Sequence, residues 1–284
     1  MKYGEVYKVG KERLMQVGIT EAELDARLLL EEICHTNRND LLVHGDKEVT
    51  AENEAKYLEW VERRAARTPL QHITGVQEFM GLEFEVNEHV LIPRQDTEIL
   101  VEEILKDLHD GTRILDMCTG SGCILISLLN FSNDCEGVGV DISEKALTVA
   151  KRNAEKLLAD KQDNTKVSFM VSDLFTELYE AVPPFDIIVS NPPYIRSDVI
   201  PTLMDEVRLH EPIGALDGME DGLFFYRKIT EQSKTFLQGG GKLFYEIGYD
   251  QGEAVKNIME TAGFLDVKVI KDFAGLDRVV CGRL

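Results

Sequence analysis

The sequence predicts an α/β protein with a doubly wound, mostly parallel sheet that ends in an antiparallel strand, preceded by a small N-terminal helical bundle. The first observation is helical periodicity from the start to about residue 70. The second is an alternation of short apolar runs with helical segments after residue 112, which is typical of parallel sheets with right-handed crossovers. The third is the short stretch around Gly275 between the last two apolar runs, which indicates an antiparallel hairpin.

The first helix-start signal lies near residue 20. Thr20 and Glu23 form a capping box, so we expect Thr20 to cap a helix. The apolar face of that helix is expected to carry Leu24, Leu28 and Ile33, and Leu29 and Leu30 are expected to widen it.

Two further helical segments complete the predicted bundle. A short helical turn is expected at 40–44, and Thr50 is expected to cap a helix with the apolar stripe Tyr57, Leu58 and Val61. A bundle of this size is marginally stable by itself, so it should pack on another part of the protein.

The pattern changes at residue 73. Within the stretch that runs from there to residue 92, apolar and polar residues partly alternate at 78–86, with Gly81 as a turn candidate, which predicts a β-hairpin. The predicted organisation is a helical domain at 1–72, a β-hairpin linker at 73–93 and an α/β domain at 94–284.

The predicted sheet is built from short apolar, β-branched runs. They are Arg113–Met117, Gly137–Asp141, Val167–Val171, Asp186–Ser190, Lys242–Glu246, Val267–Ile270 and Arg278–Cys281. Helices are expected between the strands, including one at 143–158 that Ser143 caps.

Composition and charge narrow the function classes. The chain is 44% hydrophobic and 29% charged, without an apolar run of membrane-spanning length or the apolar core of a signal peptide, so a cytoplasmic protein is expected. Its 51 acidic and 31 basic residues leave a net charge of −20. This charge would repel a polyanion overall, although a local basic patch stays open, and no direct nucleic-acid partner is expected. The acidic balance favours a protein, a small molecule or a basic partner.

Cysteines and histidines give no sign of a metal site. The five cysteines include no C-x-x-C pair and are expected to be buried free thiols. The six histidines show no metal-ligand spacing, and no metal is predicted.

A candidate ligand site lies where the first predicted strand runs into the glycine-rich turn at 116–122. Glycines let the backbone approach a ligand closely, and ligands of doubly wound sheets bind at the carboxyl ends of the strands. Asp141 ends the next strand, about 20 residues further on, where a carboxylate bonds ribose hydroxyls in dinucleotide folds. Leu125 stands where the third glycine of the dinucleotide fingerprint would fall, which favours another adenosine ligand over a nicotinamide cofactor.

Two further carboxylates bear on the same ligand. Asp116 beside the turn suits a ligand with an ammonium group better than a pyrophosphate, and Asp173 could bond an adenine amine. Each carboxylate could instead be a helix cap or a solvated loop charge.

The tetrapeptide Asn191–Tyr194 follows a buried strand and is chemically unusual. Asn191 offers an amide donor and a carbonyl acceptor, the two prolines are stiff and lack N–H groups, and Tyr194 adds an aromatic face. Together they could hold a planar amide or amine. The alternative is a strand that simply ends in a proline turn.

These features together resemble the class I S-adenosylmethionine-dependent methyltransferases, which have a Rossmann-like sheet. The resemblance rests on the turn at 116–122, Asp141, Ser172-Asp173 and Asn191–Tyr194, a signature of enzymes that methylate a planar nitrogen. Further motifs resemble the release-factor glutamine methyltransferases, the PrmC/HemK family, over nearly the whole chain. They are Arg67–Gly75, Phe79–Leu82, Leu91–Arg94, Thr97-Glu98, Glu211-Pro212, Asp221–Leu223, Tyr226-Arg227 and Phe273–Arg278.

The resemblance implies a reaction and a partner. The cofactor would be S-adenosyl-L-methionine, with S-adenosyl-L-homocysteine as product. The substrate would be the glutamine of the Gly-Gly-Gln motif in class-1 peptide chain release factors, which the helical domain would help to bind.

The resemblance also assigns residues. The implied cofactor-binding residues are Asp116, Cys118, Thr119, Gly120, Ser121, Gly122, Asp141, Ile142, Asp173, Leu174 and Asn191. The implied catalytic residues are Asn191, Pro192 and Tyr194, and Pro193 joins them in substrate binding. The chain departs from the family pattern at Cys118, often glycine, at Leu174, where tryptophan occurs, and at His72 and Gln95.

The expected mechanism depends on positioning. The Asn191 side-chain oxygen and the Pro192 carbonyl are expected to accept the two hydrogens of the glutamine amide, and Tyr194 to pack against it. Two further assignments stay open. Glu211-Pro212 shapes the loop over the substrate or ends a helix, and Arg94 contacts the cofactor or the chain junction or forms a surface salt bridge.

Three rival functions use the same features. A DNA or RNA amine methyltransferase would need a basic groove, which the acidic balance disfavours. A glutamine methyltransferase of a ribosomal protein differs mainly in what its helical domain binds. A non-catalytic binding module is disfavoured by the intact glycine turn and the tetrapeptide.

Overall fold

The computed structural model describes residues 1–178 and 183–284. These residues form two compact units. One contains residues 1–75 together with 204–210, and the other contains 76–203 together with 211–284. Over the described residues, no helix is both long and apolar enough to cross a lipid bilayer.

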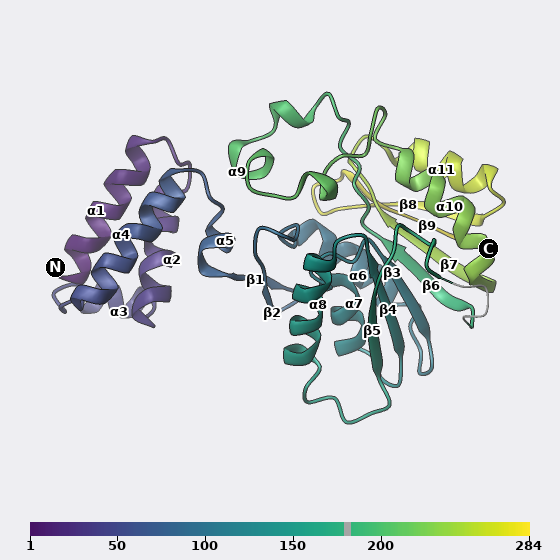
Figure 1. Ribbon diagram of the computed structural model, residues 1–284, viewed down its shortest axis with the longest axis horizontal. Helices are drawn as coiled ribbons and strands as arrows, with labels where there is room; N and C mark the ends of the chain where they lie inside the picture. The colour runs from purple at the N-terminus through teal and green to yellow at the C-terminus, as the bar shows by residue number, and fades with distance from the viewer. Residues whose placement is uncertain (179–182) are drawn as a thin grey trace. The chain divides into compact units, whose positions relative to one another are not determined.

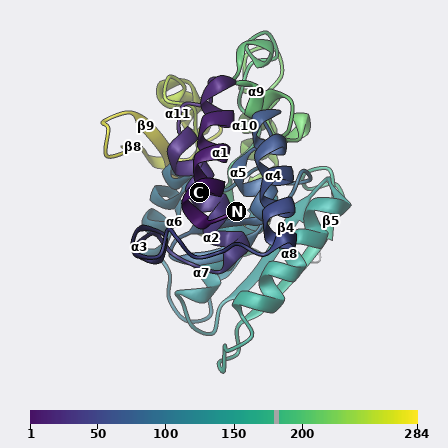
Figure 2. The ribbon, with the colours of Figure 1, turned by 90° about the vertical axis from the view of Figure 1, so that its left-hand side faces the viewer.

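The smaller unit is helical. Its elements are α1 (Tyr3–Gln16), α2 (Ala22–Cys34), α3 (Arg38–Val43), α4 (Ala51–Ala65), α5 (Leu70–Thr74) and the short α9 (Asp205–Arg208). Helices α1, α2 and α4 pack side by side around one apolar core, as Figures 1 and 2 show. Arg64 of α4 pairs with the buried Asp25 of α2 at 2.7 Å and with Glu206 of α9 at 3.2 Å.

The predicted cap of α2 is wrong, and so is part of its predicted face. The helix begins at Ala22 after Glu21, so Thr20 lies one residue too early to cap it, and no side chain of the described residues caps this end. Leu24 is 39% exposed, whereas Ala26, Leu29 and Ile33 are buried. Leu24 is two residues before Ala26, about 200° around the helix, and therefore points away from the core.

The cap of α4 is confirmed. The Thr50 hydroxyl accepts a hydrogen bond from the Asn53 amide at 3.2 Å. Tyr57 and Val61 are buried in the core as predicted.

The larger unit contains the predicted seven-stranded sheet. Its strands are β3 (Arg113–Met117), β4 (Glu136–Asp141), β5 (Lys166–Val171), β6 (Phe185–Ser190), β7 (Leu237–Glu246), β8 (Leu265–Lys271) and β9 (Asp277–Arg283), in the order β5-β4-β3-β6-β7-β9-β8. The first five strands of this order are parallel, and β9 is antiparallel to both neighbours. The predicted fold class is confirmed.

Strand β7 begins five residues before its predicted start. Its first half contains Gly239, Gly240 and Gly241, which have no apolar side chains and therefore give no strand pattern in the sequence. The pairing of β6 with β7 shifts register between Phe185 and Ile187, which accommodates these residues as an irregularity.

Helices cover both faces of the sheet (Figure 1). One face is covered by α6 (Glu98–Leu105), α7 (Cys123–Asn130) and α8 (Glu144–Leu157), and the other by α10 (Phe224–Phe236) and α11 (Gly252–Thr261). Neighbouring strand residues belong to opposite cores, as Ile187 and Ile188 do, because side chains alternate across a strand. Ser143 caps α8 as predicted, accepting from the Ala146 amide at 3.1 Å.

The hairpin consists of β1 (Val76–Phe79) and β2 (Leu82–Glu85), paired antiparallel. Its two turn residues, Met80 and Gly81, have φ of 52° and 70°, as a type I′ turn requires. Asn153 of α8 fastens β2 by exchanging two hydrogen bonds, of 2.7 and 3.0 Å, with the backbone of Glu85.

Candidate active site

The strand order brings four predicted ligand-binding segments to one edge of the sheet. Strand β3 lies between β4 and β6, and the chain turns outward in opposite directions on the two sides of β3. This topological switch point is where doubly wound sheets bind ligands. A cavity of about 510 Å³ lies at these carboxyl ends, bordered by residues that follow β3, β4, β5 and β6.

Most of the predicted site residues border this cavity. They are Cys118, Thr119, Gly120, Ser121, Asp141, Ile142, Asp173, Leu174, Asn191 and Pro193. Four other predicted site residues do not border the cavity, namely Asp116, Gly122, Pro192 and Tyr194.

The glycine turn is tied to Asp141. The Gly120 amide donates to one carboxylate oxygen of Asp141 at 2.9 Å, and the Ser143 amide donates to the other at 2.9 Å. Burial raises the pKa of Asp141, and the backbone donors oppose this rise. Each oxygen keeps a second lone pair, so Asp141 can still accept from ligand hydroxyls.

The two glycines of the turn face different surroundings. Gly120 has φ of 55°, and a Cβ there would find no atom of the described residues within 4 Å beyond its chain neighbours. Gly122 has φ of 80°, and a Cβ there would lie 2.7 Å from Ile126 Cδ1 and 3.2 Å from Ala150 Cβ. Gly120 therefore leaves room for a ligand, and Gly122 for the packing of α7.

Asp116 is fully buried behind the turn. Its Oδ2 accepts from the Thr119 hydroxyl at 2.5 Å, and its Oδ1 has no hydrogen-bond partner among the described residues. Burial raises the pKa of Asp116 from 3.8 to about 7.

The Cys123 thiol follows the same turn. Burial raises the pKa of this thiol to about 12, so Cys123 is not a nucleophile at neutral pH.

The start of the tetrapeptide is held against β3. The Ser190 hydroxyl donates to the Met117 carbonyl at 2.6 Å, and Ser190 is paired with Met117 in the parallel register of β3 and β6. Asn191 and Pro193 follow directly and border the cavity.

Tyr194 does not border the cavity, and its backbone is in close contact with two glycines. A Cβ at Gly218 would lie 2.7 Å from Tyr194 Cα, and one at Gly222 would lie 2.5 Å from the Tyr194 carbonyl oxygen. That oxygen also accepts from the Gln251 side chain at 3.1 Å. The Tyr194 ring packs against the core between α10, α11 and the sheet, and burial raises the pKa of its hydroxyl.

Arg94 and Glu211 form a pair at the cavity. Arg94 Nη2 lies 2.6 and 2.8 Å from the two carboxylate oxygens of Glu211, whose side chain is only 1% exposed. Glu211 does not end a helix, because α9 ends at Arg208. Arg94 and Pro212 both border the cavity, so the pair fixes the loop that follows β6 at its rim.

Sequence reasoning missed part of the cavity wall. Residues 213–215, Asp217, Met219, Phe224 and Phe225 border it from the loop and from the start of α10. An irregular loop has no periodicity to read. The sequential aromatic pair Phe224-Phe225 was the one available signal.

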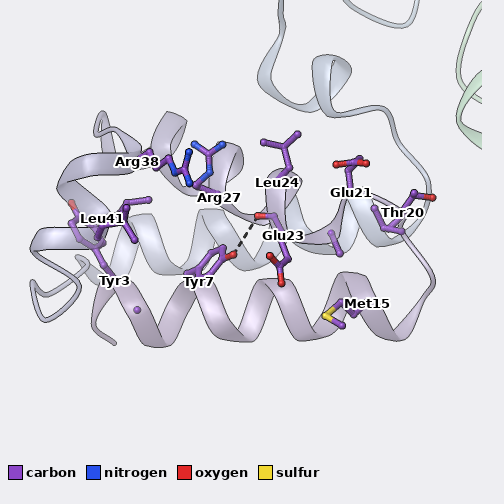
Figure 3. A pocket seen from close by; sticks show the side chains of 14 residues that line it. Tyr3, Tyr7, Met15, Thr20, Glu21, Glu23, Leu24, Arg27, Arg38 and Leu41 are labelled. Carbon is purple, nitrogen blue, oxygen red and sulfur yellow. Dashed lines mark hydrogen bonds between the residues drawn. The ribbon is translucent and has the colours of Figure 1, made fainter.

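A second cavity, of about 880 Å³, belongs to the helical unit. Figure 3 shows Tyr7 and Met15 of α1 on one side and Leu24 and Arg27 of α2 on the other, with Arg38 of α3 near Arg27. Met15 is 56% exposed. Within the described residues, no group of three His, Cys, Asp or Glu side chains could hold a metal ion.

Comparisons with known proteins cover both units. The family described as PrmC N-terminal domain matches residues 5–75, and the one described as methyltransferase small domain matches residues 94–206. A release factor glutamine methyltransferase of Clostridium acetobutylicum is 43% identical over 258 residues, 90% of this chain and 89% of that protein. One of Caulobacter vibrioides is 40% identical over 280 residues, 98% of this chain and 95% of that protein.

A solved structure is similar in fold. The crystal structure of a methyltransferase from Pyrococcus furiosus matches with a TM-score of 0.52 and 18% identity, covering 82% of this chain and 98% of that chain. At this identity the match concerns the fold alone.

Proposed function

Because the chain belongs to the release factor glutamine methyltransferase family, we propose that it methylates the side-chain amide nitrogen of the Gly-Gly-Gln glutamine in class-1 peptide chain release factors, with S-adenosyl-L-methionine as methyl donor. The observation that carries the proposal is the meeting of Asp141 and Asn191 at one cavity, on the two sides of the switch point. In this proposal Asp141 accepts hydrogen bonds from the ribose hydroxyls of the cofactor, and Asn191 holds the substrate amide at the same cavity.

The cavity suits S-adenosyl-L-methionine, which carries an ammonium and a sulfonium charge. Asp141, Asp173 and Asp217 border it, and Arg94, which also borders it, is already paired with Glu211. Asp141 would hold the ribose hydroxyls, and Cys118–Ser121, Ile142 and Leu174 would surround the remainder. When bound, the cofactor supplies an electrophilic methyl group and leaves as S-adenosyl-L-homocysteine.

The chain's own residues then have to position a poor nucleophile. An amide nitrogen shares its lone pair with the carbonyl, so its orientation matters greatly. The Asn191 side-chain oxygen accepts one amide hydrogen at the cavity, and the carbonyl of Pro192, whose neighbours Asn191 and Pro193 both border the cavity, is proposed to accept the other. These bonds strengthen as the nitrogen gains positive charge. The extra proton leaves after methyl transfer, so no strong base is needed. Tyr194 shapes this end of the site through its packing on the core.

The helical unit is proposed to contact the release factor. Met15 and Leu24 border the cavity of this unit, and both side chains are exposed. The sequence pattern had placed Leu24 on the apolar face of α2 instead. The net charge of −20 disfavours nucleic acid as the partner.

The test is methyl transfer from labelled S-adenosyl-L-methionine by the full chain. A class-1 release factor, its Gly-Gly-Gln variant with Gln→Ala, a ribosomal protein and DNA are offered in parallel. Label on the intact release factor that is absent from the variant is expected. Label on DNA or on the ribosomal protein alone would overturn the proposed substrate.

A further inference from the structure

Glu246 is a buried carboxylate next to the tetrapeptide. It is the last residue of β7, and the parallel register pairs Ser190 of β6 with Tyr245 of β7. The next residues along the two strands are Asn191 and Glu246, so these two leave the sheet side by side. Glu246 is 2% exposed and does not border the cavity, whereas Asn191 does.

The surroundings of Glu246 leave it short of donors. Its Oε2 is buried with no hydrogen-bond partner among the described residues. Burial raises the pKa of Glu246 from 4.5 to about 7, and hydrogen bonding from Thr97, the charge of Arg278 and hydrogen bonding from Asn191 oppose that rise. Asp96 raises the pKa of Glu246 by like charge.

An ionised carboxylate only accepts hydrogen bonds. The Asn191 side chain can therefore interact favourably with Glu246 only through its NH₂ group. When the NH₂ group faces Glu246, the side-chain oxygen of the same planar amide faces the other way. That oxygen is the atom that the proposed reaction needs in the cavity.

We propose that Glu246 is a positioning residue: its carboxylate accepts from the Asn191 side-chain NH₂ and thereby turns the Asn191 oxygen toward the substrate amide. This inference rests on the proposed function for its catalytic consequence. The orientation of Asn191 itself does not depend on the substrate. Glu246 acts through Asn191 and touches neither substrate nor cofactor.

A purely structural role for Glu246 would be to hold Arg278 of β9. Arg278 already has two other carboxylates, Asp272 at 3.0 Å and Asp96 at 3.1 Å. Removing the charge of Glu246 therefore leaves Arg278 paired. Asn191, by contrast, would lose the group that distinguishes its oxygen from its nitrogen.

The experiment is a double-mutant cycle of Glu246→Gln and Asn191→Ala in the full chain at pH 8. Glu246→Gln keeps the shape, but its amide can also donate, so both orientations of Asn191 become possible. We expect kcat to fall about 10- to 100-fold, the value of a charge-assisted hydrogen bond. The Kd for S-adenosyl-L-methionine should stay within about twofold, because Glu246 does not touch the cofactor site. Glu136→Gln, at the opposite end of the sheet and paired with Arg113, is the matched control with unchanged kcat.

The cycle separates positioning from folding. If Glu246 acts through Asn191, Glu246→Gln lowers kcat no further in the Asn191→Ala background. Losses that multiply would overturn the inference.

A substrate-free measurement separates this inference from the proposed function. The Asn191 NH₂ signals in a proton–nitrogen NMR spectrum, assigned by their loss in Asn191→Ala, should shift in Glu246→Gln. Unshifted signals would refute the orientation whatever the activity. If the signals shift in Glu246→Gln and the wild-type enzyme leaves the release factor unlabelled, the proposed function is refuted and the orientation is supported.

Discussion

Asn191 and Tyr194 lie three residues apart in the tetrapeptide, but they have different surroundings. Asn191 borders the cavity, whereas Tyr194 packs on the core and is held there by Gly218, Gly222 and Gln251. The stiff prolines between them transmit this anchoring to Asn191 because their φ angles are fixed. An acceptor held in this way loses little entropy when it binds the substrate amide.

Removing the Asn191 side chain should therefore affect turnover more than cofactor binding. For Asn191→Ala we expect kcat to fall about 10²- to 10³-fold, as when a preorganised transition-state contact is lost. The Kd for S-adenosyl-L-methionine should stay within about twofold. Single-turnover methylation and calorimetric titration give the two values, with Asn164→Ala, an exposed asparagine bonded to Asp134, as control. An equal loss of turnover and cofactor affinity would contradict the catalytic assignment.

At the scale of elements, the turn between β3 and α7 combines two demands in one short segment. It must leave room for a ligand at Gly120, and it must let α7 pack against α8 at Gly122. Both glycines have positive φ, which costs an L-residue about 1–2 kcal/mol. Cys118 also has positive φ, at 62°, so the turn already contains one residue with a Cβ in this conformation.

The two glycines should respond differently to the same substitution. Gly120→Ala should cost about 1 kcal/mol of stability, but weaken S-adenosyl-L-methionine binding about 10-fold or more, because its Cβ enters the ligand space. Gly122→Ala should cost about 2–4 kcal/mol, because contact with Ile126 and Ala150 adds overpacking to the backbone strain. Urea unfolding and cofactor titration measure the two effects. The explanation fails if the two variants lose stability and affinity in the same proportion.

At the scale of the whole molecule, two carboxylates buried at the site make stability depend on pH. Burial raises the pKa of Asp116 from 3.8 and of Glu246 from 4.5, in both cases to about 7. Between about pH 4 and 7 the folded protein holds these protons and the unfolded chain releases them. Their contribution to stability is therefore greatest below pH 4 and falls as the pH rises to about 7.

Replacing one of these carboxylates by a neutral isostere should remove the part of the stability loss at high pH that this carboxylate causes. For Asp116→Asn we expect the Tm at pH 8 to rise by roughly 3–6 °C, which corresponds to about 1–2 kcal/mol in a unit of this size. The difference from wild type should shrink toward pH 5, where the wild-type carboxyl is protonated. Calorimetry across this range tests it, with the exposed pair residue Asp221→Asn as control. A Tm difference that is constant with pH would contradict the linkage.

The elements of the fold could be predicted from local sequence. Apolar runs mark β3 to β6 to within a residue, because strands buried on both faces must be apolar along their length. The glycines of 116–122, Asp141 and the tetrapeptide could be identified because turns and strand ends need particular residue types. The family resemblance, confirmed by the relatives, supplied the reaction.

Only the tertiary structure decided which groups meet. Glu246 with Asn191, and Arg94 with Glu211, are far apart in sequence and come together through strand order and a long loop. Burial, and with it the raised pKa of Asp116 and Glu246, depends on neighbours from several elements. Thr20 matched a capping box but does not cap α2, which begins after Glu21. The sequence by itself determined the segments and their chemistry, since these follow from residue type and spacing. Their pairing, burial and ionisation came from contacts that no local pattern encodes.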